Sequence, residues 1–77
     1  MLYYPYMTRS EDATAKKALG NKLLEAREKL GLTQAQVAKE ARVSVNYYAR
    51  VERGEDNLGY IKLNRVFKVL KLESLIH

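Results

Sequence analysis

Residues 30–54 read LGLTQAQVAKEARVSVNYYARVERG, and this stretch decides the fold of the chain. Gly31 stands where a helix can end, because glycine takes the left-handed conformation that closes a helix at little cost. Thr33 and Gln36 then match a capping box, in which each side chain accepts a hydrogen bond from the backbone N–H of the other residue. The pattern predicts a helix that begins at Thr33 and ends near Ala41.

A second helix is predicted after a short turn. Ser44 is a favoured N-cap residue, and Gly54 can close the helix that Ser44 opens. At about 100° per residue, Tyr48 and Val51 share one arc with Ser44, and Tyr47 lies at the flank of that arc. The opposite, outward arc carries Val45, Asn46, Ala49, Arg50 and Arg53.

One further helix is predicted on each side of this pair. Residues 14–30 carry apolar side chains at helical spacing, namely Leu19, Leu23, Ala26 and Leu30. A helix from Gly59 or Tyr60 has the buried stripe Leu63, Val66, Phe67 and Leu70. Its other, solvated side carries Lys62, Arg65, Lys68 and Lys71.

The two ends of the chain give weaker patterns. Residues 1–13 hold three of the six tyrosines and the only proline, and we expect them to form an extended arm. A single domain is then expected over residues 14–77, with a helix-turn-helix at 33–53. The segment 72–77 can add one more helical turn.

Length and composition exclude several classes of function. The chain has 77 residues, which fits one domain, and no apolar run approaches the roughly 20 residues of a membrane helix. It has no cysteine and a single histidine, His77, so we expect no disulfide, no metal site and no cofactor. No nucleophile–base set or paired carboxylates indicate an enzyme. A small cytoplasmic binding domain remains.

The net charge of +5 favours an acidic partner, with nucleic acid before a membrane surface. The charge is not concentrated in the predicted helix pair. Residues 41–58 contain three arginines and three acidic residues, whereas residues 59–77 contain four bases and one acid. General attraction to DNA would therefore come from the flanking helices, and sequence preference from a few side chains.

Two short helices joined by a tight turn, with the small residue Ala38 where they would cross, describe a helix-turn-helix. Asn46 and Arg50 lie one turn apart on the outward arc, and these side chains read adenine and guanine edges. Val45 can contact a thymine methyl group. Gln34, at the start of the first helix of the pair, can bind a phosphate together with free helix amides.

Residues 19–75 resemble the Cro/repressor-type (Xre-like) helix-turn-helix domains. The matching pieces are Leu30-Gly31-Leu32-Thr33-Gln34, Val37-Ala38, Val43-Ser44, Val51-Glu52-Arg53-Gly54, Asn57, and Leu63…Val66…Leu70. The resemblance implies an all-α, lambda-repressor-like bundle of four to five helices, with the N-terminal arm added, that acts as a dimer on two-fold symmetric double-stranded DNA. It also implies a phage, plasmid or prokaryotic origin.

The resemblance also implies roles for individual residues. Val45, Asn46 and Arg50 match base-reading positions, and Arg27 and Glu52 match a buried salt bridge between the first and third helices. The positions expected against the DNA backbone are Thr33, Gln34, Ser44, Tyr47, Arg53 and Asn57. Leu72, Leu75 and Ile76 can form a dimer contact, although burial within the monomer explains them almost equally well.

Three positions depart from the family pattern. Arg42 stands where a glycine is usual, so it is expected to adopt a left-handed conformation at a cost of about 1–3 kcal/mol. Glu55 and Asp56 stand where basic residues often face phosphate, and acids there would repel DNA. Leu58 replaces a common proline.

The main prediction is a homodimeric repressor that lays the helix of residues 45–53 in a major groove. Two alternatives stay open. The first is an antitoxin of the HipB type, which the stretch Asp56-Asn57…Phe67-Lys68-Val69-Leu70-Lys71-Leu72-Glu73-Ser74 resembles and which would also bind a toxin protein. The second is a protein-interaction module that has lost DNA binding.

Overall fold

The computed structural model describes residues 9–72, with side chains from Asp12 onward, and this part of the chain is all helical. Its four helices are α1 (Arg9–Leu30), α2 (Gln34–Ala41), α3 (Val45–Glu52) and α4 (Tyr60–Val69). No strand occurs within residues 9–72. The expected all-α bundle is confirmed. Of the possible helical turn over residues 72–77, Leu72 is described and is not helical, and the rest, with Leu75 and Ile76, lies outside the described residues.

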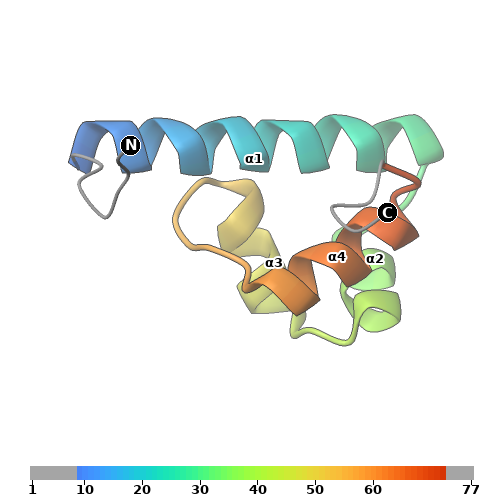
Figure 1. Ribbon diagram of the computed structural model, residues 1–77. Coiled ribbons are helices and arrows are strands. Elements are labelled where there is room, and N and C mark those ends of the chain that lie inside the picture. The colour runs from blue at the N-terminus through green and yellow to red at the C-terminus, as the bar shows by residue number, and fades with distance from the viewer. Residues whose placement is uncertain (1–8, 73–77) are drawn as a thin grey trace.

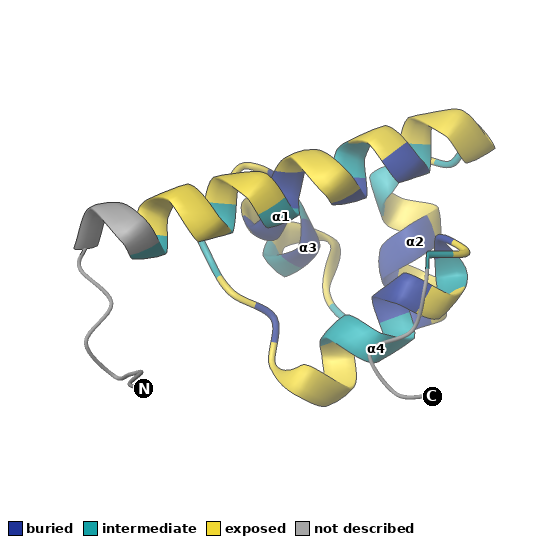
Figure 2. Ribbon diagram, turned by 45° about the horizontal axis from the view of Figure 1, so that its top comes forward, coloured by how far each residue is buried: buried dark blue, intermediate teal, exposed yellow. Residues whose placement is uncertain are grey.

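The first helix is longer than the apolar pattern predicts. We expected an arm over residues 1–13, but α1 begins at Arg9, so residues 9–13 belong to the helix and only residues 1–8 lie outside the description. The apolar spacing starts at Leu19 and could not reveal this beginning. An ion pair between Lys16 and Asp12, with 3.2 Å between Nζ and Oδ2, adds local support one turn apart. Figures 1 and 2 show the first turns of α1 projecting past the other helices.

The capping signals around α2 and α3 hold as expected. The Thr33 N–H donates to Gln36 Oε1 at 2.7 Å, and the Gln36 N–H donates to Thr33 Oγ1 at 3.0 Å, which completes the capping box. Ser44 Oγ accepts from the Tyr47 N–H at 3.1 Å. Arg42 ends α2 in the left-handed conformation, with a φ of 62°. The caps and this turn set the angle between α2 and α3.

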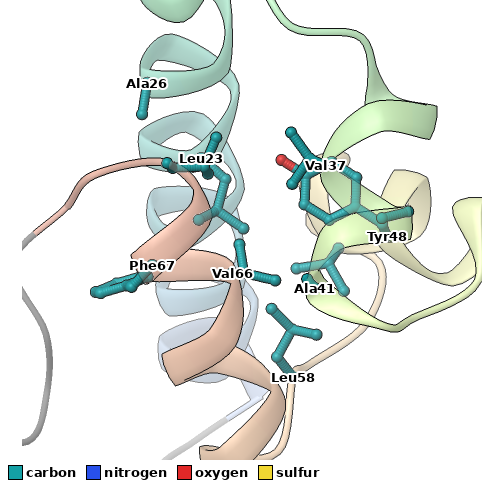
Figure 3. Close-up of a cluster of buried hydrophobic side chains, with 11 residues drawn as sticks. Leu23, Ala26, Val37, Ala41, Tyr48, Leu58, Val66 and Phe67 are labelled. Atoms are coloured by element: carbon teal, nitrogen blue, oxygen red, sulfur yellow. The ribbon is translucent and has the colours of Figure 1, made fainter.

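The core lies between α1 and the three shorter helices, with Leu23 of α1 facing Val66 of α4 (Figure 3). Leu23, Val37, Tyr48, Val51 and Val66 are its largest fully buried side chains, and Figure 2 shows the buried residues on the facing sides of the helices. Ala38 is buried as expected at the contact between α2 and α3. Leu58, which replaces the usual proline, also turns its side chain into the core.

Three predicted core positions, among them the half-buried Leu19, are less buried than their spacing suggests. Leu30 is 38% exposed because it sits in the last turn of α1, past the other helices' core-facing surfaces. Leu63 is half-buried and packs against the edge of the core. Helical spacing gives the direction of a side chain but not whether another element covers it.

Two tertiary contacts have no signal in the sequence. Arg65, which we expected on the solvated side of α4, is partly buried, and its Nε donates to the carbonyl of Ala41 at 2.8 Å, at the end of α2. Gly20 lies against the end of α3, where an added Cβ would stand 2.7 Å from the Val51 carbonyl oxygen and closer still to that of Glu52. The Arg65 hydrogen bond joins α4 to the end of α2, and the absence of a side chain at Gly20 lets α1 approach the end of α3 closely. Within the described residues, no helix is long and apolar enough to cross a membrane.

Candidate nucleic-acid interface

The outward face of α3 presents the side chains expected to read bases. Val45 is 43% exposed, and Asn46 and Arg50 are also exposed, whereas Tyr48 and Val51 on the opposite arc are fully buried. Helical periodicity therefore predicted the buried Tyr48 and Val51 correctly, whereas Ser44, expected on the same arc, is exposed. An exposed Asn and Arg one turn apart can reach base edges in a major groove.

The arginines on this face have acidic partners in the loop between α3 and α4. Arg50 Nε lies 3.4 Å from Asp56 Oδ2, and Arg53 Nε lies 3.0 Å from Glu55 Oε2. A second contact joins Arg53 Nη2 to Glu55 Oε1 at 3.1 Å. The hydrogen bond from Arg53 holds the pKa of Glu55 below its ordinary value. Glu55 is therefore a charged partner of Arg53, and Asp56 lies within ion-pair distance of Arg50.

Tyr47 links α3 to the loop and to α4. Its hydroxyl donates a hydrogen bond to the backbone carbonyl of Asn57. Its ring has the Arg50 guanidinium 5.7 Å from the centroid and the Lys62 ammonium 5.2 Å from it. Lys62 was expected only on a solvated basic side, and its place beside the interface follows from the tertiary packing of α4 against α2.

The beginnings of α2 and α3 carry the other expected DNA-backbone residues. Thr33 and Ser44 use their hydroxyl oxygens as acceptors for the helix caps. A hydroxyl hydrogen remains on each side chain and can be donated to a phosphate oxygen. Gln34 is half-buried, and its Nε2 donates to Glu52 Oε1 at 2.8 Å, so one N–H of the amide remains for phosphate.

A partly buried ion pair stands behind this surface. Arg27 Nε donates to Glu52 Oε2 at 2.7 Å and Arg27 Nη2 to Glu52 Oε1 at 3.1 Å, while Arg27 Nη1 donates to the Leu32 carbonyl at 2.9 Å. The Glu52 side chain is only 4% exposed. The structure therefore contains the pair between α1 and α3 that the family resemblance implies, and it adds Gln34 to the network.

The electrostatics of this network follow from its geometry. Burial alone would raise the pKa of the Glu52 carboxyl, but hydrogen bonding, with Arg27 the strongest contributor, outweighs it and holds that pKa below its ordinary value. Burial, followed by the neighbouring Glu52 carboxylate, raises the pKa of Tyr48 far above its ordinary range. Glu52 is thus a charged structural group, and Tyr48 stays neutral.

The structure brings most of the expected residues to one side of the α2–α3 unit. Val45, Asn46 and Arg50 share the outward face of α3, and Arg53 and Asn57 follow at its end. The acidic partners Glu55 and Asp56 and the neighbouring Lys62 had no assigned contact from the sequence, because their partners lie on another turn or helix. Among the described side chains, no three histidine or acidic groups gather in a way that could hold a metal ion.

Comparison with known proteins agrees with this geometry. A family model described as helix-turn-helix matches residues 23–75. The crystal structure of the clp gene regulator ClgR from Corynebacterium glutamicum is similar, with a TM-score of 0.72 and 32% sequence identity. The similarity covers 74% of this chain and 61% of that chain, so this chain spans about three fifths of the regulator's length. No curated protein matches. From its fold, its capped helix pair and the match over residues 23–75, the chain belongs to the Cro/repressor-type, Xre-like helix-turn-helix family.

Proposed function

We propose that the protein is a sequence-specific DNA-binding transcriptional regulator that acts as a homodimeric repressor. The observation that carries this proposal is the outward face of α3, where Asn46, Arg50 and Val45 are exposed beside a rigidly capped α2. A helix held in this way can enter the major groove with its side chains already positioned. Binding across a promoter would then exclude polymerase.

The proposed contacts divide into two groups. Asn46 and Arg50 read base edges, and Val45 packs against a thymine methyl group. The DNA backbone is contacted by groups around them, which fixes the register of α3 without sequence information. This second group consists of Thr33, Gln34, Ser44, Tyr47, Arg53 and Asn57.

The proposed dimer uses the end of the described chain. Leu72 is half-buried and lines a groove of about 390 Å³ together with Leu30 and Leu70. Leu75 and Ile76 would extend this apolar contact. A two-fold pair of α3 helices requires half-sites about one helical turn apart, roughly 34 Å.

Selection of preferred sites from random duplex DNA tests the proposal. The expected result is an enriched pair of inverted half-sites about 10 base pairs apart from centre to centre. Affinity for the selected site should fall linearly in log–log plots against salt, because phosphate contacts release counterions. Absence of binding to any duplex at low salt would contradict the proposal and favour a protein-interaction module. An antitoxin would bind the same DNA and also co-purify with its toxin.

A further inference from the structure

The described arginines on the exposed face of α3, Arg50 and Arg53, are occupied by carboxylates from the α3–α4 loop. Arg50 approaches Asp56 and Arg53 approaches Glu55, all four side chains being between 41% and 55% exposed. The charges of these four residues cancel. A DNA phosphate that approaches Arg50 or Arg53 therefore meets a carboxylate beside each guanidinium, and the positive charge that is left near this face comes from Lys62.

Asp56 is held in a defined orientation. Its Oδ1 accepts the Asn57 N–H at 2.8 Å, which leaves Oδ2 directed toward the Arg50 guanidinium at 3.4 Å from Nε and 3.5 Å from Nη2. The hydrogen bond from the Tyr47 hydroxyl to the Asn57 carbonyl ties the loop to α3. The carboxylate is thus fixed beside Arg50, while its bonds to Arg50 are long and easily exchanged.

This arrangement affects two kinds of DNA unequally. Binding to unrelated DNA comes almost entirely from phosphate contacts, which a fixed carboxylate opposes. A guanine edge offers Arg50 two acceptors in one plane, and such a contact discriminates about tenfold or more. Arg50 therefore gains free energy when it exchanges its contact with Asp56 for a matching base edge. It gains much less when it exchanges that contact for a phosphate.

We propose that Asp56 is a specificity-determining residue, which keeps Arg50 from unrelated phosphates and releases it to a matching base edge. The inference rests on the proposed function. Glu55 likewise opposes phosphate binding by Arg53, because Arg53 must first give up its two hydrogen bonds to that carboxylate. Asp56 does not contact the base itself and acts by positioning and occupying Arg50.

The test compares full-length wild-type protein with Asp56→Asn on two duplexes of equal length, the preferred site and an unrelated sequence, over a range of salt concentrations. Asparagine keeps the size of the side chain and the acceptor for the Asn57 N–H, and it removes the charge. Glu28→Gln is the matched control, because Glu28 is an exposed acid on α1 outside this face.

We expect Asp56→Asn to bind the unrelated duplex about three- to tenfold more tightly than the wild type does, with a slope of log affinity against log salt that is steeper by about 0.9. Its affinity for the preferred site should rise by less than about twofold. The specificity ratio should fall, and Glu28→Gln should leave it unchanged. If Asp56→Asn raised the affinity for both duplexes by the same factor, the specificity ratio would stay unchanged, as in the Glu28→Gln control. That result would overturn this inference and leave the proposed function standing. Wild-type protein that bound neither duplex at low salt would overturn the proposed function and this inference together.

Discussion

The end of α3 carries two kinds of arginine–carboxylate pair that differ in burial. Glu52 is 4% exposed and holds Arg27, which is 15% exposed, across the gap between α3 and α1. Asp56 is 41% exposed and meets Arg50, which is 45% exposed, within one segment of chain. A guanidinium–carboxylate pair therefore lies in the interior on one side of α3, and another lies on the proposed DNA surface on the other side.

The contrast shows that burial, and not the residue types, decides what an ion pair does. A charge inside the protein is strongly destabilising when its partner is removed, so the Arg27–Glu52 pair holds α1 against α3. An exposed pair contributes about 0–1 kcal/mol and is screened by salt, so Arg50 can exchange Asp56 for another acceptor. The exchangeable pairs are suited to ligand binding because the rigid pair keeps their helix in place.

Removal of the buried carboxylate is expected to have the largest effect. Glu52→Ala leaves Arg27 without its partner and should lower the free energy of unfolding by about 3–5 kcal/mol. The melting temperature should then fall by more than about 10 °C, as measured by circular dichroism. Glu55→Ala is the control and should leave the melting temperature unchanged. Equal effects from the two variants would remove the distinction between the pairs.

A test of the same contact without any change of charge uses Gly20. Gly20→Ala places a methyl group against the carbonyl oxygens of Val51 and Glu52, so α1 must move away from α3. The expected loss in the free energy of unfolding is about 1–3 kcal/mol, measured by urea titration. Gly59→Ala, where an added Cβ meets no atom within 4 Å, should be nearly neutral. A neutral Gly20→Ala would show that α1 is free to shift.

A substitution in the exposed Arg50–Asp56 pair should change the affinity for DNA and leave the stability of the fold unchanged. Arg50→Ala should weaken binding to the preferred site by about 1–3 kcal/mol and relax the preference at one base pair. Its melting temperature should match that of the wild type, since the pair with Asp56 is exposed. An equal loss of affinity on all sequences would instead make Arg50 a phosphate contact.

The lowered pKa of Glu52 makes the stability contributed by the buried pair depend on pH. Because hydrogen bonds hold this pKa below the ordinary value of 4.5, the stabilisation is complete above about pH 4.5. It is lost as the pH falls through the lower pKa of the folded protein. Between pH 6 and pH 3, urea midpoints of the wild type should therefore fall further than those of Glu52→Gln. Parallel curves would contradict a charged Glu52 in the folded state.

The smallest effect is expected at an arginine whose backbone conformation matters more than its charge. Arg42 has a φ of 62°, which costs a non-glycine residue about 1 kcal/mol. Arg42→Gly should raise the free energy of unfolding by about that amount, whereas Arg42→Ala loses the same charge and should gain nothing. A gain in both variants would assign the effect to charge.

Local signals in the sequence predicted most of the fold. Thr33 with Gln36, Ser44 and Gly54 placed the start of α2 and both ends of α3 to within a residue, and Gly31 placed the end of α1, because caps act over four or five residues of chain. The arc analysis separated the buried Tyr48 from the exposed Arg50. The role of Glu52 came only from the family resemblance, since nothing nearby in the chain distinguishes it from Glu55.

Several features that escaped prediction depend on distant parts of the chain. Arg65 meets the Ala41 carbonyl across 24 positions, and Gly20 meets the end of α3 across more than 30. Lys62 reaches the ring of Tyr47 only because α4 packs beside the α2–α3 unit. Residues 9–13 belong to α1 although no apolar pattern marks them.

The beginnings of α2 and α3, the buried side of α3 and its outward side chains could all be predicted along the chain. These properties follow from hydrogen bonding and helical periodicity over short segments. The pairing of charges, their burial and the positions of Lys62 and Arg65 are properties of the folded molecule. Burial and long-range pairing depend on how complete helices cross, and that geometry sets both the strength of each ion pair and its proposed part in binding DNA.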